Sequence, residues 1–143
     1  MRVLGMDIGS KRIGVAVSDE LGLTAQGVRT ILRKDLESDL EEITGLVRLY
    51  TVEEIVVGVP YNMDGSEGPA ALAVREMMDR LAARVTVPVQ EWDERLSTVA
   101  AERALLEADL SRAKRRKVID KVAAVLILQG YLDRFHIRGC PSP

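Results

Sequence analysis

The sequence predicts an α/β fold with a mixed five-stranded sheet, in which three antiparallel strands are followed by two parallel strands and helices flank the sheet. Two observations predict it. Residues 1–33 hold three β-type apolar runs separated by very short turns, and such turns allow only antiparallel pairing. From residue 35 onward, helical and strand-like patterns alternate, which indicates right-handed crossovers that place later strands parallel to the first.

The first three strands form a meander. Arg2–Ile8 is a short apolar run that contains a carboxylate near its end and is followed by a Gly-Ser pair. β-Branched residues resume in Arg12–Asp19, and a turn at residues 21–23 leads to a weakly alternating third strand at Thr24–Leu32.

Two crossovers follow the meander. Apolar residues recur at helical spacing across Asp35–Tyr50. The nearly continuous apolar run Glu53–Pro60 is typical of a buried parallel strand. A second helix is expected over Ala70–Arg84, with Pro69 in its first turn. Val85–Trp92 then supplies the fifth strand.

Two further helices complete the chain. The first is expected over Ser97–Ala108, and the last runs from about Val118 to Phe135 after a polar, basic stretch at 110–117. The sequence therefore predicts one domain over residues 1–136. Residues 137–143 show no periodicity and are expected to form a flexible tail.

Composition excludes several classes of function. Lys and Arg total 20 against 22 Asp and Glu, so the net charge of -2 excludes a generally polycationic nucleic-acid binder but not a local basic patch. The single cysteine, Cys140, excludes an intramolecular disulfide and a Cys-based zinc site. No apolar run approaches the roughly 20 residues that cross a bilayer, and the N-terminus does not resemble a signal peptide. We therefore expect a cytoplasmic protein without a membrane partner.

Acidic residues fall at the ends of three predicted elements. Asp7 lies near the end of the first strand, Asp93 and Glu94 directly follow the fifth, and Asp120 lies in the first turn of the predicted last helix. Each has a structural interpretation as a turn residue, a helix cap or a charge favourable to the helix dipole. Adjacent acids point to opposite faces of an extended chain, so only one of Asp93 and Glu94 is expected to face a site.

Taken together, these acids indicate a chemistry. Carboxylates that converge at the carboxyl ends of parallel strands repel one another unless cations bind between them. Hard oxygen ligands suit Mg²⁺ or Mn²⁺. Two such ions about 4 Å apart can activate water and stabilise the leaving oxygen in phosphodiester cleavage. The sequence therefore predicts a Mg²⁺- or Mn²⁺-dependent phosphoryl-transfer site.

Basic residues lie close to these acids in the sequence. Although a run of charges is more often a solvated surface, positive charge beside such a site suits a phosphate backbone. The residues predicted to bind nucleic acid are Lys11, Arg12, Arg95, Arg112, Lys114, Arg115, Arg116 and Lys117.

Four segments resemble, in order, the motifs of the YqgF (RuvX) family, whose members are described as pre-16S rRNA nucleases and as Holliday-junction-resolvase-like. The segments are Met6–Asp19, Val56–Gly68, Trp92–Glu102 and Lys114–Asp133, and the resemblance extends from Arg2 to about Phe135. It implies an RNase H-like fold. The loop at 61–68 belongs to the family pattern, and its residues suit a structural turn and a substrate contact equally well.

The resemblance also implies a site. Its acidic triad corresponds to Asp7, Glu94 and Asp120, as catalytic and metal-binding residues. Glu94 is preferred to Asp93 by analogy with related RNase H-like nucleases, and the sequence alone does not decide between them. The resemblance implies divalent metal and hydrolysis of RNA or branched DNA.

The leading hypothesis is a metal-dependent endonuclease that processes the 5′ end of pre-16S rRNA, with structured RNA and the ribosome or its precursor as partners. A resolvase of four-way DNA junctions is an alternative and should be a homodimer with two equivalent sites, whereas the sequence leaves monomer and homodimer open. A non-catalytic RNA- or ribosome-binding factor is a third hypothesis. An ATPase of the actin and sugar-kinase superfamily is disfavoured because it needs two lobes and a longer chain.

Overall fold

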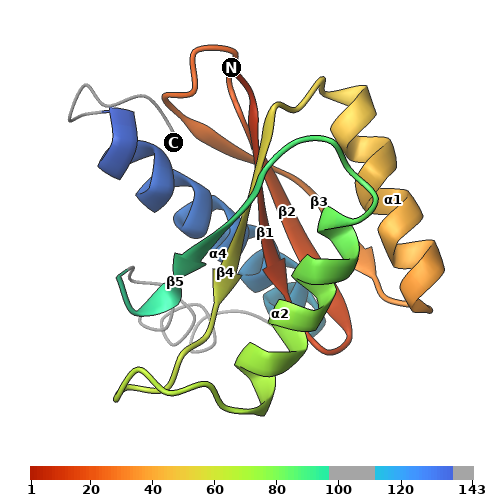
Figure 1. Cartoon of the computed structure of the whole chain (residues 1–143), viewed down its shortest axis with the longest axis vertical. Coiled ribbons are helices and arrows are strands. Elements are labelled where there is room, and N and C mark those ends of the chain that lie inside the picture. Colours follow the sequence, from red (N-terminus) through yellow and green to blue (C-terminus); the bar gives the residue numbers. More distant parts are fainter. Residues whose placement is uncertain (97–111, 137–143) are drawn as a thin grey trace.

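A mixed five-stranded sheet forms the centre of the molecule (Figure 1). The computed structural model describes residues 1–96 and 112–136, with side chains for 1–96 and 121–135. The strands are β1 (Val3–Ile8), β2 (Arg12–Ser18), β3 (Ala25–Leu32), β4 (Glu54–Val59) and β5 (Val89–Asp93), in the order β3-β2-β1-β4-β5. Pairing is antiparallel among β1, β2 and β3 and parallel among β1, β4 and β5. The predicted sheet is confirmed.

Short turns close the meander. The Gly9 N–H donates to the Arg12 carbonyl at 2.8 Å between β1 and β2. In the next turn the Asp19 carboxylate accepts the backbone N–H of Leu23 at 2.7 Å. Gly22 adopts a φ of 69° there, which glycine does without strain. Connections this short explain why the first three strands pair antiparallel.

Within the described residues, three helices and one 3₁₀ turn accompany the sheet. They are α1 (Leu36–Leu49), α2 (Pro69–Ala82), η1 (Glu94–Leu96) and α4 (Arg112–His136). Asp35 caps α1 by accepting the Ser38 N–H at 2.8 Å. The N-cap of α2 is Gly68, which makes no side-chain capping bond, and α2 starts with proline at its first position.

The fifth strand is shorter than predicted. It begins at Val89, whereas the apolar pattern places its start at Val85. The Val85 N–H donates to the Leu81 carbonyl at 3.1 Å, so Val85 lies in the turn that follows α2. Pro88, which lacks an N–H, contributes only its carbonyl, which accepts the Ile55 N–H at 2.9 Å.

The last helix is longer than predicted. It begins at Arg112, not near Val118, so the basic stretch is helical. Long unbranched Lys and Arg side chains favour helix even where no apolar period marks it. The helix predicted at Ser97–Ala108 and the tail at 137–143 lie outside the described residues. Among the helices that the structure describes, none has the length and apolar character needed to cross a membrane.

The two faces of the sheet are packed differently. Helices α1 and α2 cover one face, which carries large apolar side chains such as Leu4 and Met6, and α4 covers the other (Figure 1). On the α4 face, Gly5 leaves so little space that a Cβ there would lie 2.6 Å from the Cβ of Leu128. Small residues, including Ala123 on the helix, therefore let α4 approach the sheet closely.

Candidate functional site

Asp7 lies on the α4 face of the sheet, near the end of β1. Successive strand residues alternate between faces, and Val3 and Gly5 of the same strand lie beneath α4. Asp7 continues this alternation, and only 7% of its surface is exposed. Burying a carboxylate is costly unless cations or hydrogen-bond donors compensate it, so the surroundings of Asp7 must supply such groups.

Glycines border Asp7 on both neighbouring strands. Gly14 of β2 pairs directly with Asp7. On the other side, Val57 of β4 pairs with Met6, so the next residue, Gly58, lies beside Asp7. A Cβ on Gly58 would lie 3.1 Å from the Cγ of Glu94. The Glu94 side chain therefore lies over β4, on the same face as Asp7.

The pleat of β5 separates the two adjacent acids. Asp93 lies on the opposite face, with Glu91, and its carboxylate is occupied by Arg95, whose Nε donates at 3.0 Å and Nη2 at 2.6 Å. The hydrogen bonds from Arg95 hold the pKa of Asp93 below its usual value despite partial burial. Of the two acids, only Glu94 shares the face of Asp7.

Asp120 belongs to the helix that crosses this face. Leu128 lies against Gly5 in the middle of β1, and Tyr131, further along α4, donates to Glu54 at the start of β4 at 3.1 Å. The helix therefore runs antiparallel to these strands, and its earlier turns lie toward their carboxyl ends. The backbone of Asp120 is two turns before Leu128, in that direction.

One expectation about Asp120 is wrong. It is not in the first turn of the helix, because α4 starts at Arg112 and Asp120 is its ninth residue. The helix dipole acts mainly within the first turn, so it no longer explains an acid at this position. The Asp120 side chain lies outside the described residues.

The basic residues predicted to bind nucleic acid lie in four places: the β1–β2 hairpin, the start of β2, η1 and the first turns of α4. Lys11 is exposed in the β1–β2 hairpin. Arg12, half-buried at the start of β2, is on the same strand face as Gly14 and hence as Asp7. Arg95 pairs with Asp93, as described above. The remaining five are in the first turns of α4, with side chains outside the described part of the chain: Arg112, Lys114, Arg115, Arg116 and Lys117.

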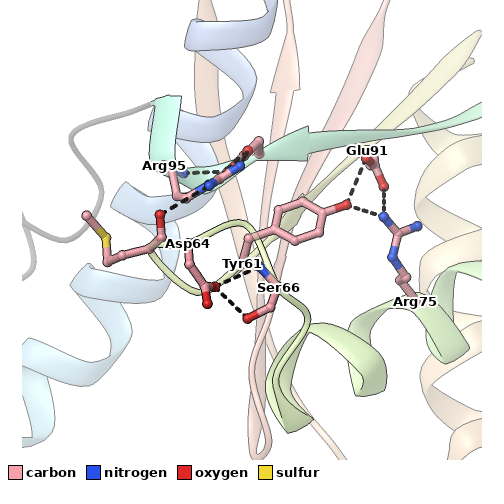
Figure 2. Close-up of polar contacts among 8 residues, drawn as sticks. Tyr61, Asp64, Ser66, Arg75, Glu91 and Arg95 are labelled. Carbon is pink, nitrogen blue, oxygen red and sulfur yellow. Dashed lines mark hydrogen bonds and ion pairs between the residues drawn. The ribbon is translucent and has the colours of Figure 1, made fainter.

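A polar network around Tyr61, on the face of the sheet opposite the Glu94 side chain, was missed by the sequence analysis. Tyr61 lies between the guanidinium groups of Arg75 and Arg95, each with its Cζ 5.5 Å from the ring centre (Figure 2). The Tyr61 hydroxyl donates to Glu91 at 2.9 Å and accepts from Arg75, which also pairs with Glu91 at 2.6 Å. These residues lie on a loop, a helix and a strand, so no local sequence pattern links them.

The loop at 61–68 is closed by its own polar groups. The Asp64 carboxylate accepts hydrogen bonds from the Ser66 hydroxyl at 2.6 Å and from the Ser66 backbone N–H at 2.9 Å. These hydrogen bonds lower the pKa of Asp64. The Asn62 carbonyl accepts the Gly65 N–H at 2.8 Å. Ser66 is thus used inside the loop and does not cap α2, whose N-cap is Gly68.

The donor chemistry of the site fits a hard divalent cation. Asp7 and Glu94 present carboxylate oxygens, which suit Mg²⁺ or Mn²⁺ better than a soft metal. Within the side chains that the structure describes, no group of three or more His, Cys, Asp or Glu could hold a metal ion. Asp120, the predicted third ligand, has a side chain outside this part of the chain.

Comparison with known proteins identifies close relatives in sequence. A family model described as "RuvX: Holliday junction resolvase" matches residues 1–134. A protein from Halothermothrix orenii is 61% identical over 133 residues, covering 93% of this chain and 95% of its own. One from Moorella thermoacetica is 60% identical over 139 residues, covering 97% and 99%. Both are named "Putative pre-16S rRNA nuclease".

Solved structures show the same architecture at low sequence identity. RuvC of T. thermophilus, in complex with a Holliday junction substrate, superposes with a TM-score of 0.61 at 14% identity, covering 94% of this chain and 95% of its own. The fowlpox virus Holliday junction resolvase gives a TM-score of 0.56 at 12% identity, covering 94% and 99%. These similarities confirm the expected RNase H-like fold.

Proposed function

This chain belongs to the RuvX family, and on that premise we propose that it is a divalent-metal-dependent endonuclease that hydrolyses phosphodiester bonds in structured nucleic acid. The observation that carries the proposal is the placement of Asp7 and Glu94 on one face of the sheet, at the carboxyl ends of its parallel strands. Ligand sites in open α/β sheets form at these ends. Hydrolysis of a phosphodiester is the reaction that such carboxylates support when they hold divalent ions.

The roles of the residues follow from their positions. Asp7 and Glu94 would hold the metal, with Asp120 as the third ligand. When bound, divalent ions activate water and stabilise the charge on the leaving oxygen. Asp7 is held rigidly because β1 is paired on both sides. Lys11 and Arg12 would neutralise phosphates that approach the hairpin.

We further propose structured RNA as the substrate, and the 5′ end of pre-16S rRNA as the biological target, because relatives about three-fifths identical carry that name. The protein would then act in the cytoplasm, with the ribosome precursor as its partner. A four-way DNA junction is the second candidate substrate, favoured by the description of the family model. A junction resolvase would act as a homodimer with two equivalent sites.

The test compares the wild-type protein with Asp7→Asn, using precursor rRNA and a four-way DNA junction in Mg²⁺ or Mn²⁺. We expect Asp7→Asn to reduce cleavage by about 100-fold or more, because it removes a carboxylate ligand, while folding and nucleic-acid binding persist. Asp79→Asn is the matched control, since Asp79 is exposed on α2, on the opposite face of the sheet.

Each outcome discriminates between the hypotheses. Cleavage by Asp7→Asn at the wild-type rate would overturn the assignment of Asp7. Binding without cleavage by the wild-type protein in both metals would favour a non-catalytic RNA- or ribosome-binding factor. Mapping the products on the two substrates separates rRNA processing from paired, symmetric cuts in a junction.

A further inference from the structure

The turn that carries Glu94 is closed by its two neighbours. The Asp93 carboxylate accepts the backbone N–H of Arg95 at 2.9 Å, and the Arg95 guanidinium donates hydrogen bonds to the same carboxylate. This ring of contacts constrains the peptide groups on both sides of Glu94. The Glu94 side chain then lies on the other face of the sheet, over Gly58.

Arg95 is in turn held by the loop at 61–68. Its Nη1 donates to the Met63 carbonyl at 3.4 Å. Gly65, with a φ of 89°, approaches the guanidinium so closely that a Cβ there would lie 3.3 Å from Nη1. The ring of Tyr61 lies along another side of the guanidinium (Figure 2). The loop therefore restricts the directions in which Arg95 can point.

Tyr61 is anchored from its other side by α2 and β5. Its hydroxyl donates to Glu91 and accepts from Arg75, and the Arg75 guanidinium also lies against the ring. Partial burial and the Glu91 carboxylate raise the pKa of Tyr61. The hydroxyl therefore stays protonated at neutral pH and keeps donating to Glu91. The ring is fixed between two cations, which stabilises the stack through cation–π attraction.

We propose that Tyr61 is a positioning residue for the cleavage site: its ring, held between Arg75 and Arg95, fixes the turn that presents Glu94 on the α4 face. The inference rests on the proposed function and assigns no substrate contact to Tyr61, which acts through Arg95 and Asp93 from the opposite face. Its loss should loosen Glu94, lower kcat and leave affinity for nucleic acid unchanged. If the loop at 61–68 contacted substrate instead, loss of the Tyr61 ring would mainly weaken the affinity for nucleic acid and would leave kcat unchanged.

The kinetic test uses two variants of Tyr61 and one control. Tyr61→Leu removes the ring, and we expect kcat to fall about 10-fold, since small misplacements of catalytic groups cost this much or more, with the RNA dissociation constant within about 2-fold of wild type. Tyr61→Phe keeps the ring and should restore most of kcat. Tyr50→Leu removes a half-buried ring at the end of α1, away from Glu94, and should cleave like wild type.

A second readout does not depend on activity. Hydrogen exchange measured by NMR reports the Arg95 backbone N–H, which bonds to Asp93, against the Leu23 N–H, which bonds to Asp19 in the same way at a distant turn. Tyr61→Leu should accelerate exchange about 10-fold at Arg95 and not at Leu23. Equal acceleration at both would mean a general loss of stability and would overturn the proposal.

The two readouts separate the two proposals. Unchanged kcat in Tyr61→Leu, with an active wild type, overturns the positioning role alone. A weakened RNA affinity with normal kcat also overturns it, in favour of substrate contact by the loop. An inactive wild type refutes the proposed function, and exchange at Arg95 then decides whether Tyr61 still fixes the turn.

Discussion

Replacing Gly5 by alanine tests how closely α4 packs on the sheet. The new Cβ would lie 2.6 Å from the Cβ of Leu128 and 3.3 Å from the carbonyl oxygen of Ala124. Carbon atoms pack best at about 3.5–4.0 Å, so α4 must move by about 1 Å. Neither atom is the end of a flexible side chain, so the helix backbone itself must shift. Overpacking of this kind costs about 1–3 kcal/mol.

The net effect is smaller than the overpacking cost. A strand alanine is favoured over glycine by about 0.5–1 kcal/mol, because glycine loses more conformational freedom on folding. We therefore expect Gly5→Ala to lower the free energy of unfolding by about 1–2 kcal/mol, which corresponds to a Tm lower by about 3–6 °C. Urea denaturation followed by circular dichroism measures it.

Gly27→Ala is the matched control on the same face. At Gly27 of β3 the nearest atom to an added Cβ, the Cβ of Lys121, would be 3.4 Å away, an ordinary contact. This variant should keep or raise stability by up to about 1 kcal/mol. If Gly5→Ala proves as stable as Gly27→Ala, α4 does not pack against β1 as described and the reasoning is refuted.

Three further changes test the site and its surroundings. In Gly58→Ala, the new Cβ would meet the Glu94 Cγ at 3.1 Å and the movable end of an isoleucine side chain, so cleavage should fall about 10-fold while urea denaturation shows a loss of about 1 kcal/mol. Asp39→Asn weakens the ion pair of a 3%-exposed carboxylate with Arg33 at 3.1 Å, and should lower the free energy of unfolding by about 2–3 kcal/mol in the same assay. Asp19 has a pKa below 3.8 in the folded protein because two backbone N–H groups bond to it, so its stabilisation is present above pH 3.8 and is lost as pH falls through the lower folded value. Asp19→Asn should therefore reduce the fall in Tm on the acid side of a Tm–pH profile and leave the slope of the profile unchanged at pH values where the wild-type carboxylate is fully ionised.

The sequence predicts best those features that depend on short-range pattern. The order of the elements and the position of Asp7 near the end of β1 both follow from periodicity and turn chemistry. The start of α4 was predicted too late in the chain because residues 112–117 show no apolar periodicity. Only the helix propensity of their Lys and Arg side chains indicates a helix in this stretch. Tyr61 carries no signal of its own, since its partners come from distant elements.

The choice between Asp93 and Glu94 could be predicted from the sequence only in part. Alternation predicts that only one of them faces the site, and the sequence does not say which. In the structure, the buried Trp92 lies beneath α4, so the residue two positions later returns to that face. The decision thus depends on which face α4 covers, and that is a property of the folded sheet.

The small residues beneath α4 are better explained by the proposed site than by stability. With α4 further from the sheet, larger side chains at Gly5, Gly14 and Gly58 could bury more apolar surface, as large side chains do on the face covered by α1 and α2. Aspartate, however, is short, so Asp7 on β1 and Asp120 on α4 can share an ion only if the helix backbone comes close to the strand. Close approach requires glycine on the sheet, which is where the structure has it. Substitutions that enlarge this face should therefore cost more in cleavage than in stability, a trade-off typical of functional sites.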